Sequence, residues 1–175
     1  MKYFVVRQAA VPRPDSLRGP SPWDSRQSVA AWLGARAIEL THTSWLTSGF
    51  ASDCGYDAAP FAWSAERRFI LRCEVDAAVF HLYGLAPSQV AHVMDSFRLV
   101  RDADETEYGQ FRTKHLILEI FEHMTQAIES GVPYETILDP HPADPRAAHP
   151  LRAGEASAET LRRAAPSPLA GGSGK

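Results

Sequence analysis

A long amphipathic helix over residues 65 to 83 is the feature that most constrains the fold of this 175-residue chain. Ser64 is a suitable N-cap, and Gly84 stands where helices commonly end in a left-handed residue. Apolar side chains recur along this segment at helical spacing, at Phe69, Cys73, Ala77, Phe80 and Tyr83. Such a stripe has to pack against another element, so the chain is predicted to form a helical bundle.

Other segments with helical spacing supply the rest of the bundle. A second long helix is predicted for residues 110 to 130, with Ile117, Ile120, Phe121, Met124 and Ile128 on one face. A helix of about three turns is expected after Asp24 or Ser25 as its N-cap, and a further helix begins near Pro87. A short helix is expected around Trp45, Leu46 and Phe50. The charged stretch RDADETEYG is interpreted as a link between helices.

The two ends of the chain differ from this middle part. Residues 1 to 22 are predicted to hold a short strand, KYFVVRQ, and a proline-rich connection. Residues 23 to 140 form the predicted helical domain, in which Phe61 and Trp63 fill a gap between helices. Residues 141 to 175 are rich in Ala, Pro, Gly and Ser and are expected to be mostly disordered. The predicted fold is therefore mainly α, a small bundle of four to five helices with one short amino-terminal strand and a disordered tail.

Charge and cysteine content exclude several classes of protein. Residues 1 to 140 carry 13 Lys and Arg against 18 Asp and Glu, which argues against a domain that binds nucleic acid by itself. Cys54 and Cys73 form no C-x-x-C motif, so neither a zinc ribbon nor a disulfide framework is indicated. The first residues do not resemble a signal peptide or a membrane span. A cytoplasmic location without membrane contact is expected.

Asp76 interrupts the apolar stripe of the first helix, in the stretch LRCEVDAAVFHLYGL. A buried carboxylate has to be paired, hydrogen-bonded or protonated. A structural ion pair is favoured, with Arg112 as the preferred partner. A catalytic carboxylate and a partly exposed aspartate at the helix edge remain as alternatives.

No catalytic, cofactor or metal site is predicted. His115, Glu119, Glu122 and His123 share a helix face, but two histidines eight residues apart are about 12 Å apart along the axis, so a solvated face is favoured. The chain has no G-x-S-x-G elbow and no phosphate-binding glycine loop. The basic residues either pair with neighbouring acids or form a rim that contacts DNA phosphates; the candidates for such a rim are Arg67, Arg68, Arg72, Arg98, Arg101 and Lys114.

The order of four segments carries a resemblance to a known family. These segments are YFVVRQAAVPRP, ELTHTSWLTSGFASDCGYDAAPFAWSAERR, LRCEVDAAVFHLYGLAPSQVAHVMDSFRLV and YGQFRTKHLILEIFEHM. In this order they resemble the carboxy-terminal region of large adenine-N6 DNA methyltransferases of restriction-modification and phage-defence systems. The resemblance covers about residues 3 to 125. It implies helical scaffolding beside a DNA-recognition region, at the positions Glu74, Asp76, Tyr83, Gly84, Gly109, Arg112, Thr113 and Lys114.

The departures from that family define the expected function. The S-adenosylmethionine loop, the N-P-P-Y tetrapeptide and a nuclease motif are absent from the sequence, and Gln110 stands where the family tends to have Glu. The resemblance therefore implies a non-catalytic accessory or specificity-region fragment. It would need no cofactor and would contact DNA only in complex with a methylase core. Partner-facing aromatics are expected at Tyr3, Phe4, Trp23, Trp32 and Trp45. The alternative is a stand-alone helical protein-interaction module without a nucleic-acid role.

Overall fold

The computed structural model describes residue 12 and residues 14 to 150. Within this range the helices are α2 (Pro14–Arg18), α3 (Val29–Thr41), α4 (Ser48–Asp53), α5 (Ala65–Leu82), α6 (Pro87–Asp95), α7 (Arg98–Tyr108) and α8 (Arg112–Ser130). Two short strands, β1 (Pro20–Ser21) and β2 (Asp24–Ser28), pair antiparallel. The 3-10 turns are η1 (Trp45–Thr47) and η2 (Pro145–Ala147). The mainly helical prediction is confirmed, whereas the strand predicted at residues 2 to 8 lies outside the described residues.

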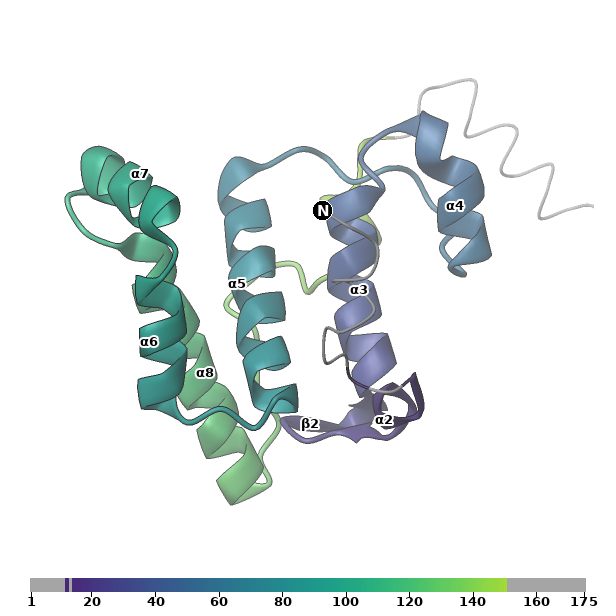
Figure 1. Ribbon diagram of the computed structural model, residues 1–175. Coiled ribbons are helices and arrows are strands. Elements are labelled where there is room, and N and C mark those ends of the chain that lie inside the picture. The colour runs from purple at the N-terminus through teal and green to yellow at the C-terminus, as the bar shows by residue number, and fades with distance from the viewer. Residues whose placement is uncertain (1–11, 13, 151–175) are drawn as a thin grey trace, which may run out of the picture.

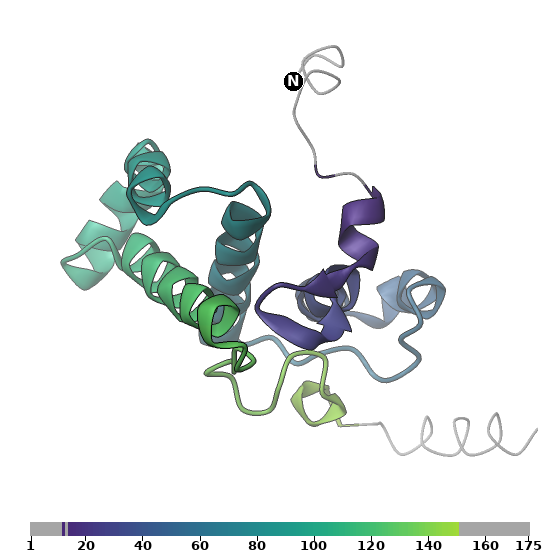
Figure 2. The same ribbon diagram turned by 90° about the horizontal axis from the view of Figure 1, so that it is seen from below.

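Helix α5 is the centre of the bundle. It packs against α8 on one side and against α3 on the other (Figures 1 and 2). Helices α6 and α7 pack on α8, and α4 lies beyond α3 (Figure 1). In the part of the chain that the structure describes, no helix combines the length and the apolar character needed to cross a membrane.

The larger hydrophobic core lies where α5 and α8 meet and extends to α3 and α6. Its members include Trp23, Trp32, Cys73, Ala77, Ala78, Val90, Met94, Phe111, Ile117, Ile120, Phe121, Met124, Ala127 and Tyr134. A smaller core forms between α3, α4 and the end of the described chain, around Ile38, Ala51 and Phe61. The two cores share helix α3, which contributes Trp32 to the larger core and Ile38 to the smaller one.

Local signals predicted several helix ends correctly. Ser64 Oγ accepts a hydrogen bond from Arg67 N at 3.3 Å and so caps α5. Pro87 opens α6, and Gly131 ends α8 with a φ of 71°. These ends depend on capping and backbone preferences that act over only a few residues.

Two predictions about local structure are wrong. Helix α3 begins at Val29 with Ser28 as its N-cap, about one turn later than expected, because Asp24 belongs to β2 and accepts hydrogen bonds there from Arg26 and Gln27. The supposed link RDADETEYG lies largely within α7. Most of its charged side chains are exposed while the helix packs on α8. The partly buried carboxylate of Asp104 accepts a hydrogen bond from Thr113 N at 2.6 Å.

The segment after α8 returns across the molecule and contacts both hydrophobic cores. Tyr134 N donates to Trp23 O at 2.8 Å, and Phe61 forms an antiparallel bridge with Ala148. Residues 141 to 150 are therefore part of the fold, and the predicted start of the disordered tail at residue 141 is wrong. Phe61 is buried as expected, but Trp63 is 67% exposed and does not fill the core.

His81 lies at the interface between α5 and α8. Its ring stacks on Phe121 with 3.8 Å between ring centroids, and Nε2 lies 3.0 Å from Phe121 O, which requires a proton on Nε2. Burial lowers the pKa of His81 from its ordinary value of 6.5, although the hydrogen bond to Phe121 O acts in the opposite direction. The neutral imidazole is therefore the form that fits this interface.

This pKa shift predicts a pH dependence of stability. Below about pH 6.5, His81 takes up a proton more readily in the unfolded chain than in the folded one, so the free energy of unfolding should fall as the pH drops. The fall should end once the pH is below the lowered pKa of His81 in the folded state. The variant His81→Gln keeps an Nε2 donor but does not titrate, so it should flatten the dependence between about pH 5 and pH 7. Urea unfolding across that range measures the effect. The exposed His115→Gln on α8 is the matched control, and equal slopes for both variants would contradict the assignment.

Candidate functional site

A buried ion pair joins α3 to α5. Arg36 Nε of α3 donates to Glu74 Oε2 of α5 at 2.8 Å, and the two side chains are 5% and 0% exposed. The hydroxyl of Tyr134 donates to the other carboxylate oxygen of Glu74 at 2.9 Å. Both oxygens of Glu74 therefore have donors, as a buried carboxylate requires.

The ring of Trp32 covers the guanidinium of Arg36. Its Cζ atom lies 3.2 Å from the centroid of the Trp32 ring, and Nη1 donates to Trp32 O at 2.9 Å. Burial lowers the pKa of Arg36, and the charge of Glu74 opposes that shift. Burial and the adjacent Glu74 both raise the pKa of Tyr134, so its hydroxyl keeps its proton and remains a donor.

A second ion pair links the same two helices with the charges reversed. Glu39 of α3 pairs with Arg67 of α5, and the same carboxylate accepts Ala143 N at 2.9 Å. Arg67 also donates to His141 O at 3.1 Å. Each helix thus contributes one acid and one base, which fixes the inner face of α3 against α5 and against the returning segment.

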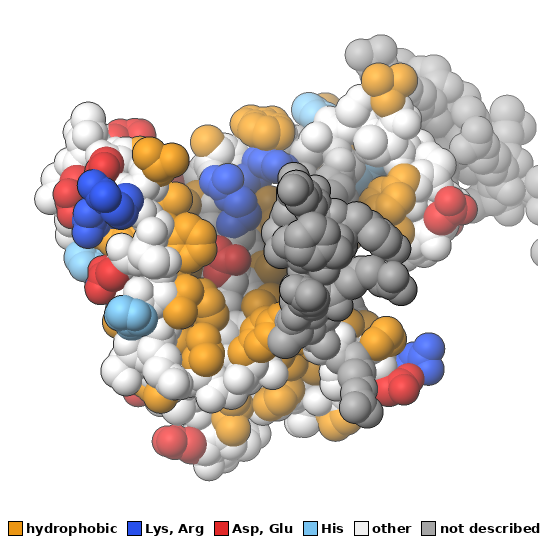
Figure 3. Space-filling model, viewed as in Figure 1, with side chains coloured by type: hydrophobic (Ala, Val, Ile, Leu, Met, Phe, Trp, Pro, Cys, Tyr) orange, Lys and Arg blue, Asp and Glu red, His pale blue; other side chains and the backbone are white. Residues whose placement is uncertain are grey.

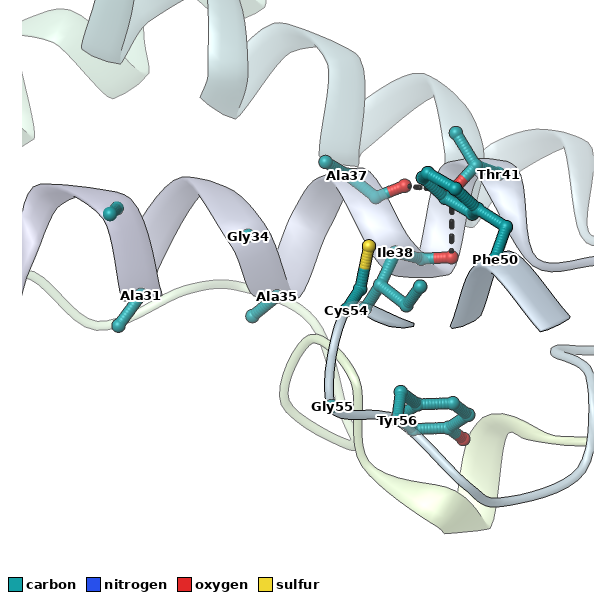
Figure 4. Close-up of a pocket in the computed structure, with 11 residues that line it drawn as sticks. Ala31, Gly34, Ala35, Ala37, Ile38, Thr41, Phe50, Cys54, Gly55 and Tyr56 are labelled. Atoms are coloured by element: carbon teal, nitrogen blue, oxygen red, sulfur yellow. Dashed lines mark hydrogen bonds between the residues drawn. The ribbon is translucent and has the colours of Figure 1, made fainter. Parts of the chain in front are cut away.

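The outer face of α3 is left open and carries small side chains. Together with α4 it forms a groove of about 410 Å³ (Figure 4). The residues that line the groove are Ala30, Ala31, Gly34, Ala35, Ala37, Ile38, Thr41, Phe50, Cys54, Gly55 and Tyr56. None of them carries a charge, and most of them are exposed to solvent.

The polar groups of the groove are mostly engaged within the chain. The hydroxyl of Thr41 donates to Ala37 O at 2.7 Å, one of the bonds drawn in Figure 4. The hydroxyl of Tyr56 donates to Ala59 O at 3.3 Å, and burial raises the pKa of Tyr56 to about 12. The groove therefore offers a contact surface that is mainly apolar.

His42 supports the wall of this groove from behind. Its ring is fully buried and packs edge to face on Tyr56 at 5.7 Å. Nδ1 lies 2.8 Å from Thr47 Oγ1, whose own proton goes to Ser44 O, so Nδ1 is the donor of this pair. Nε2 has no hydrogen-bond partner among the described residues.

The predicted pair between Asp76 and Arg112 is not formed. Arg112 pairs instead with Glu66 and lies over the rings of Phe69 and Tyr108. Asp76 occupies an exposed position of α5, although the surrounding protein restricts its hydration and raises the pKa of its carboxyl, with Arg72 opposing the shift. The buried, paired carboxylate of this helix is Glu74, and the sequence interpretation chose the wrong residue.

The basic residues considered for DNA phosphates are largely occupied. Arg67 pairs with Glu39, Arg101 lies 3.6 Å from Asp102, and Lys114 pairs with Asp95 at 2.6 Å. Arg68 donates to Leu40 O at 2.9 Å and lies over the ring of Trp63. Arg72 and Arg98 are exposed and form no ion pair within the described part of the chain. Four of the six candidates are therefore already engaged within the chain.

The remaining predicted positions serve the scaffold. Gly84 follows α5 with a φ of 66°, and Gly109 ends α7 with a φ of 71°. The backbone N–H of Thr113 donates to the carboxylate of Asp104. Trp23 and Trp32 are buried, so the prediction that they face a partner is wrong, whereas Trp45 is exposed. Tyr3 and Phe4 lie outside the described residues.

The helix face considered for metal binding is exposed to solvent. His115, Glu119, Glu122 and His123 all lie at exposed positions of α8. Among residues 12 and 14 to 150, no group of three or more His, Cys, Asp or Glu side chains is arranged to hold a metal ion. Both cysteines are free thiols, and burial raises the pKa of Cys73 to about 12.

Comparisons with protein-family models, with curated proteins and with solved structures find no match to this chain.

The ion pair predicts which carboxylate of α5 stabilises the fold. Glu74→Gln should lower the free energy of unfolding by about 3 to 5 kcal/mol, because it leaves the charge of Arg36 buried without a partner. Asp76→Asn, two residues away, should change it by less than about 0.5 kcal/mol. Urea denaturation of both variants measures the difference. A larger loss at Asp76 than at Glu74 would contradict the assignment.

Proposed function

We propose that the chain is a non-catalytic helical module that works by binding another protein. The partner proposed from the sequence resemblance is the core of a cytoplasmic DNA adenine methyltransferase of a restriction-modification system. In this proposal the chain contributes to DNA recognition as an accessory or specificity subunit. Contact with DNA occurs in the complex and not through the isolated chain.

The observation that carries the proposal is the apolar surface formed by η1, α4 and the outer face of α3. Leu46 is 96% exposed and Phe50 is 54% exposed, and Trp45 lies beside them in the chain. Phe50 lines the uncharged groove described above, and Trp45 and Leu46 lie in η1, the turn that leads directly into α4. Exposed apolar groups that form one continuous surface are typical of protein-binding sites.

The distribution of charge supports contact with protein over direct contact with DNA. Over α7, basic side chains lie among acidic ones (Figure 3). Helix α7 contains Arg98 and Arg101 but also four acidic residues, Asp102, Asp104, Glu105 and Glu107. Paired cations release few counterions from DNA, so the affinity of the isolated chain for DNA should be low and weakly dependent on salt.

The second candidate function is a helical protein-interaction module with no role at DNA. The same apolar surface and the same paired cations support it. The two candidates differ in the identity of the partner, so co-purification with a methylase core distinguishes them.

The full chain should co-purify with an N-P-P-Y-bearing methylase core encoded by the adjacent reading frame, and should change its methylation of cognate DNA. Leu46→Asp should weaken that association at least about tenfold, since it places a charge on the apolar surface. Leu99→Asp on α7 is the matched control, because Leu99 is similarly exposed but lies on a different helix. The affinities are measured by titration at two salt concentrations.

Two results would contradict the methylase proposal. One is that neither co-purification nor methylation changes when the full chain is added to the core. The other is that the isolated chain binds duplex DNA tightly, with an affinity that falls steeply as salt increases. In the first case, an association with a different protein would support the interaction module instead.

A further inference from the structure

We propose that the groove between α3 and α4 is the docking site for one amphipathic helix of the protein partner. The docked helix presents small and aliphatic side chains to α3 and basic side chains to the α4 end of the groove. This inference rests on the proposed function, because it names the surface and the kind of partner through which the module binds.

The shape of the groove fits a helix. Ala30, Gly34 and Ala37 lie exposed along the outer face of α3, a helix of 13 residues, which gives a floor about 20 Å long. Small side chains allow two helix axes to approach to the shorter end of the usual 8 to 10 Å range. Phe50 borders the groove beside Thr41, and Tyr56 lies across from it (Figure 4). The occupant therefore lies along α3 between an aromatic wall and open solvent.

Hydrogen bonding favours a helix over an extended peptide. The floor is the side of a helix, so its backbone groups are already paired along α3. The hydroxyls of Thr41 and Tyr56 donate within the chain. An extended peptide would find no strand edge there to satisfy its own backbone, whereas a helix satisfies its backbone internally.

The charges around the groove indicate the sign of the partner. Asp53 and Asp57 flank Cys54, Gly55 and Tyr56 in the chain, and both are exposed. Neither forms an ion pair within the part of the chain that the structure describes. The charged residues of α3, Arg36 and Glu39, are buried on its opposite face and paired with α5. Asp53 and Asp57 therefore place negative charge beside the part of the groove that Cys54, Gly55 and Tyr56 line, which complements basic side chains on the docked helix.

Synthetic helices test this site without knowledge of the natural partner. The probes are two labelled Ala/Leu peptides of about 18 residues, which span about 27 Å as helices. One peptide carries lysines near one end, and the other carries glutamates at the same positions. Fluorescence anisotropy with the full chain measures affinity, and amide shifts in a nitrogen-15 spectrum locate the contact. The lysine peptide should bind at least about fivefold more tightly than the glutamate peptide, and should shift amides of α3 and α4.

Two glycines provide matched variants. A Cβ atom added at Gly34 or at Gly49 meets no other atom within 4 Å, so both positions accept a side chain without a clash. Gly34 lines the groove and Gly49 does not. Gly34→Leu should weaken binding of the lysine peptide at least about tenfold by filling the floor, while Gly49→Leu leaves it unchanged. A second variant, Asp53→Lys with Asp57→Lys, should reverse the preference between the two peptides.

The other outcomes overturn the proposal. Failure of the lysine peptide to bind would reject the site. Equal binding of that peptide by the two glycine variants, or a preference for the glutamate peptide, would also reject it. Self-association that Gly34→Leu abolishes would assign the groove to a second copy of this chain. If the lysine peptide binds only after Leu161→Glu is introduced, the natural occupant of the groove is the segment of residues 151 to 175 of the chain itself. If the methylase core still co-purifies with Gly34→Leu, the groove assignment fails while the proposed function stands.

Discussion

Arg36 of α3 and Glu74 of α5 form a salt bridge that is almost fully removed from water. A charge pair removed from water is tolerated only when its geometry satisfies both partners, and Tyr134 and Trp32 complete that geometry here. The requirement fixes how α3 sits on α5 and draws the segment after α8 back across both helices. Among the described residues, α4 and the turn after it border the opposite face of α3, and together they form the groove.

Local signals predicted much of the fold, and tertiary contacts explain the errors. Ser64 and Gly131 mark helix ends through capping and left-handed backbone, which depend on neighbouring residues alone. The polar stretch before Gly109 has no apolar stripe, yet it forms α7 because it packs on α8. Residues 141 to 150 have a composition typical of disorder, and they are held by hydrogen bonds to Pro60, Ala62, Arg67 and Glu39, which lie far away in the sequence.

Tertiary contacts also explain the error in the candidate site. A buried, paired carboxylate on α5 was predicted correctly in kind but assigned to Asp76. The prediction assumed that α5 has one buried face, whereas α5 contacts α8 and α3 together and buries Glu74 on the side toward α3. The spacing of Trp32 and Arg36 on one face of α3 is a sequence signal that could have indicated a basic partner. The groove could not be predicted from the sequence. Its Ala and Gly residues are equally typical of a helix face that is buried against another element.

A double-mutant cycle measures how far the contributions of Arg36 and Glu74 to stability depend on each other. Arg36→Leu and Glu74→Leu are each measured by urea unfolding, together with the double variant. If the pair fixes α3 on α5, the double variant should be more stable than the sum of the two single losses predicts, with a coupling energy of about 2 to 3 kcal/mol. Additive losses, within about 0.5 kcal/mol, would show that the two side chains do not depend on each other and would contradict the account.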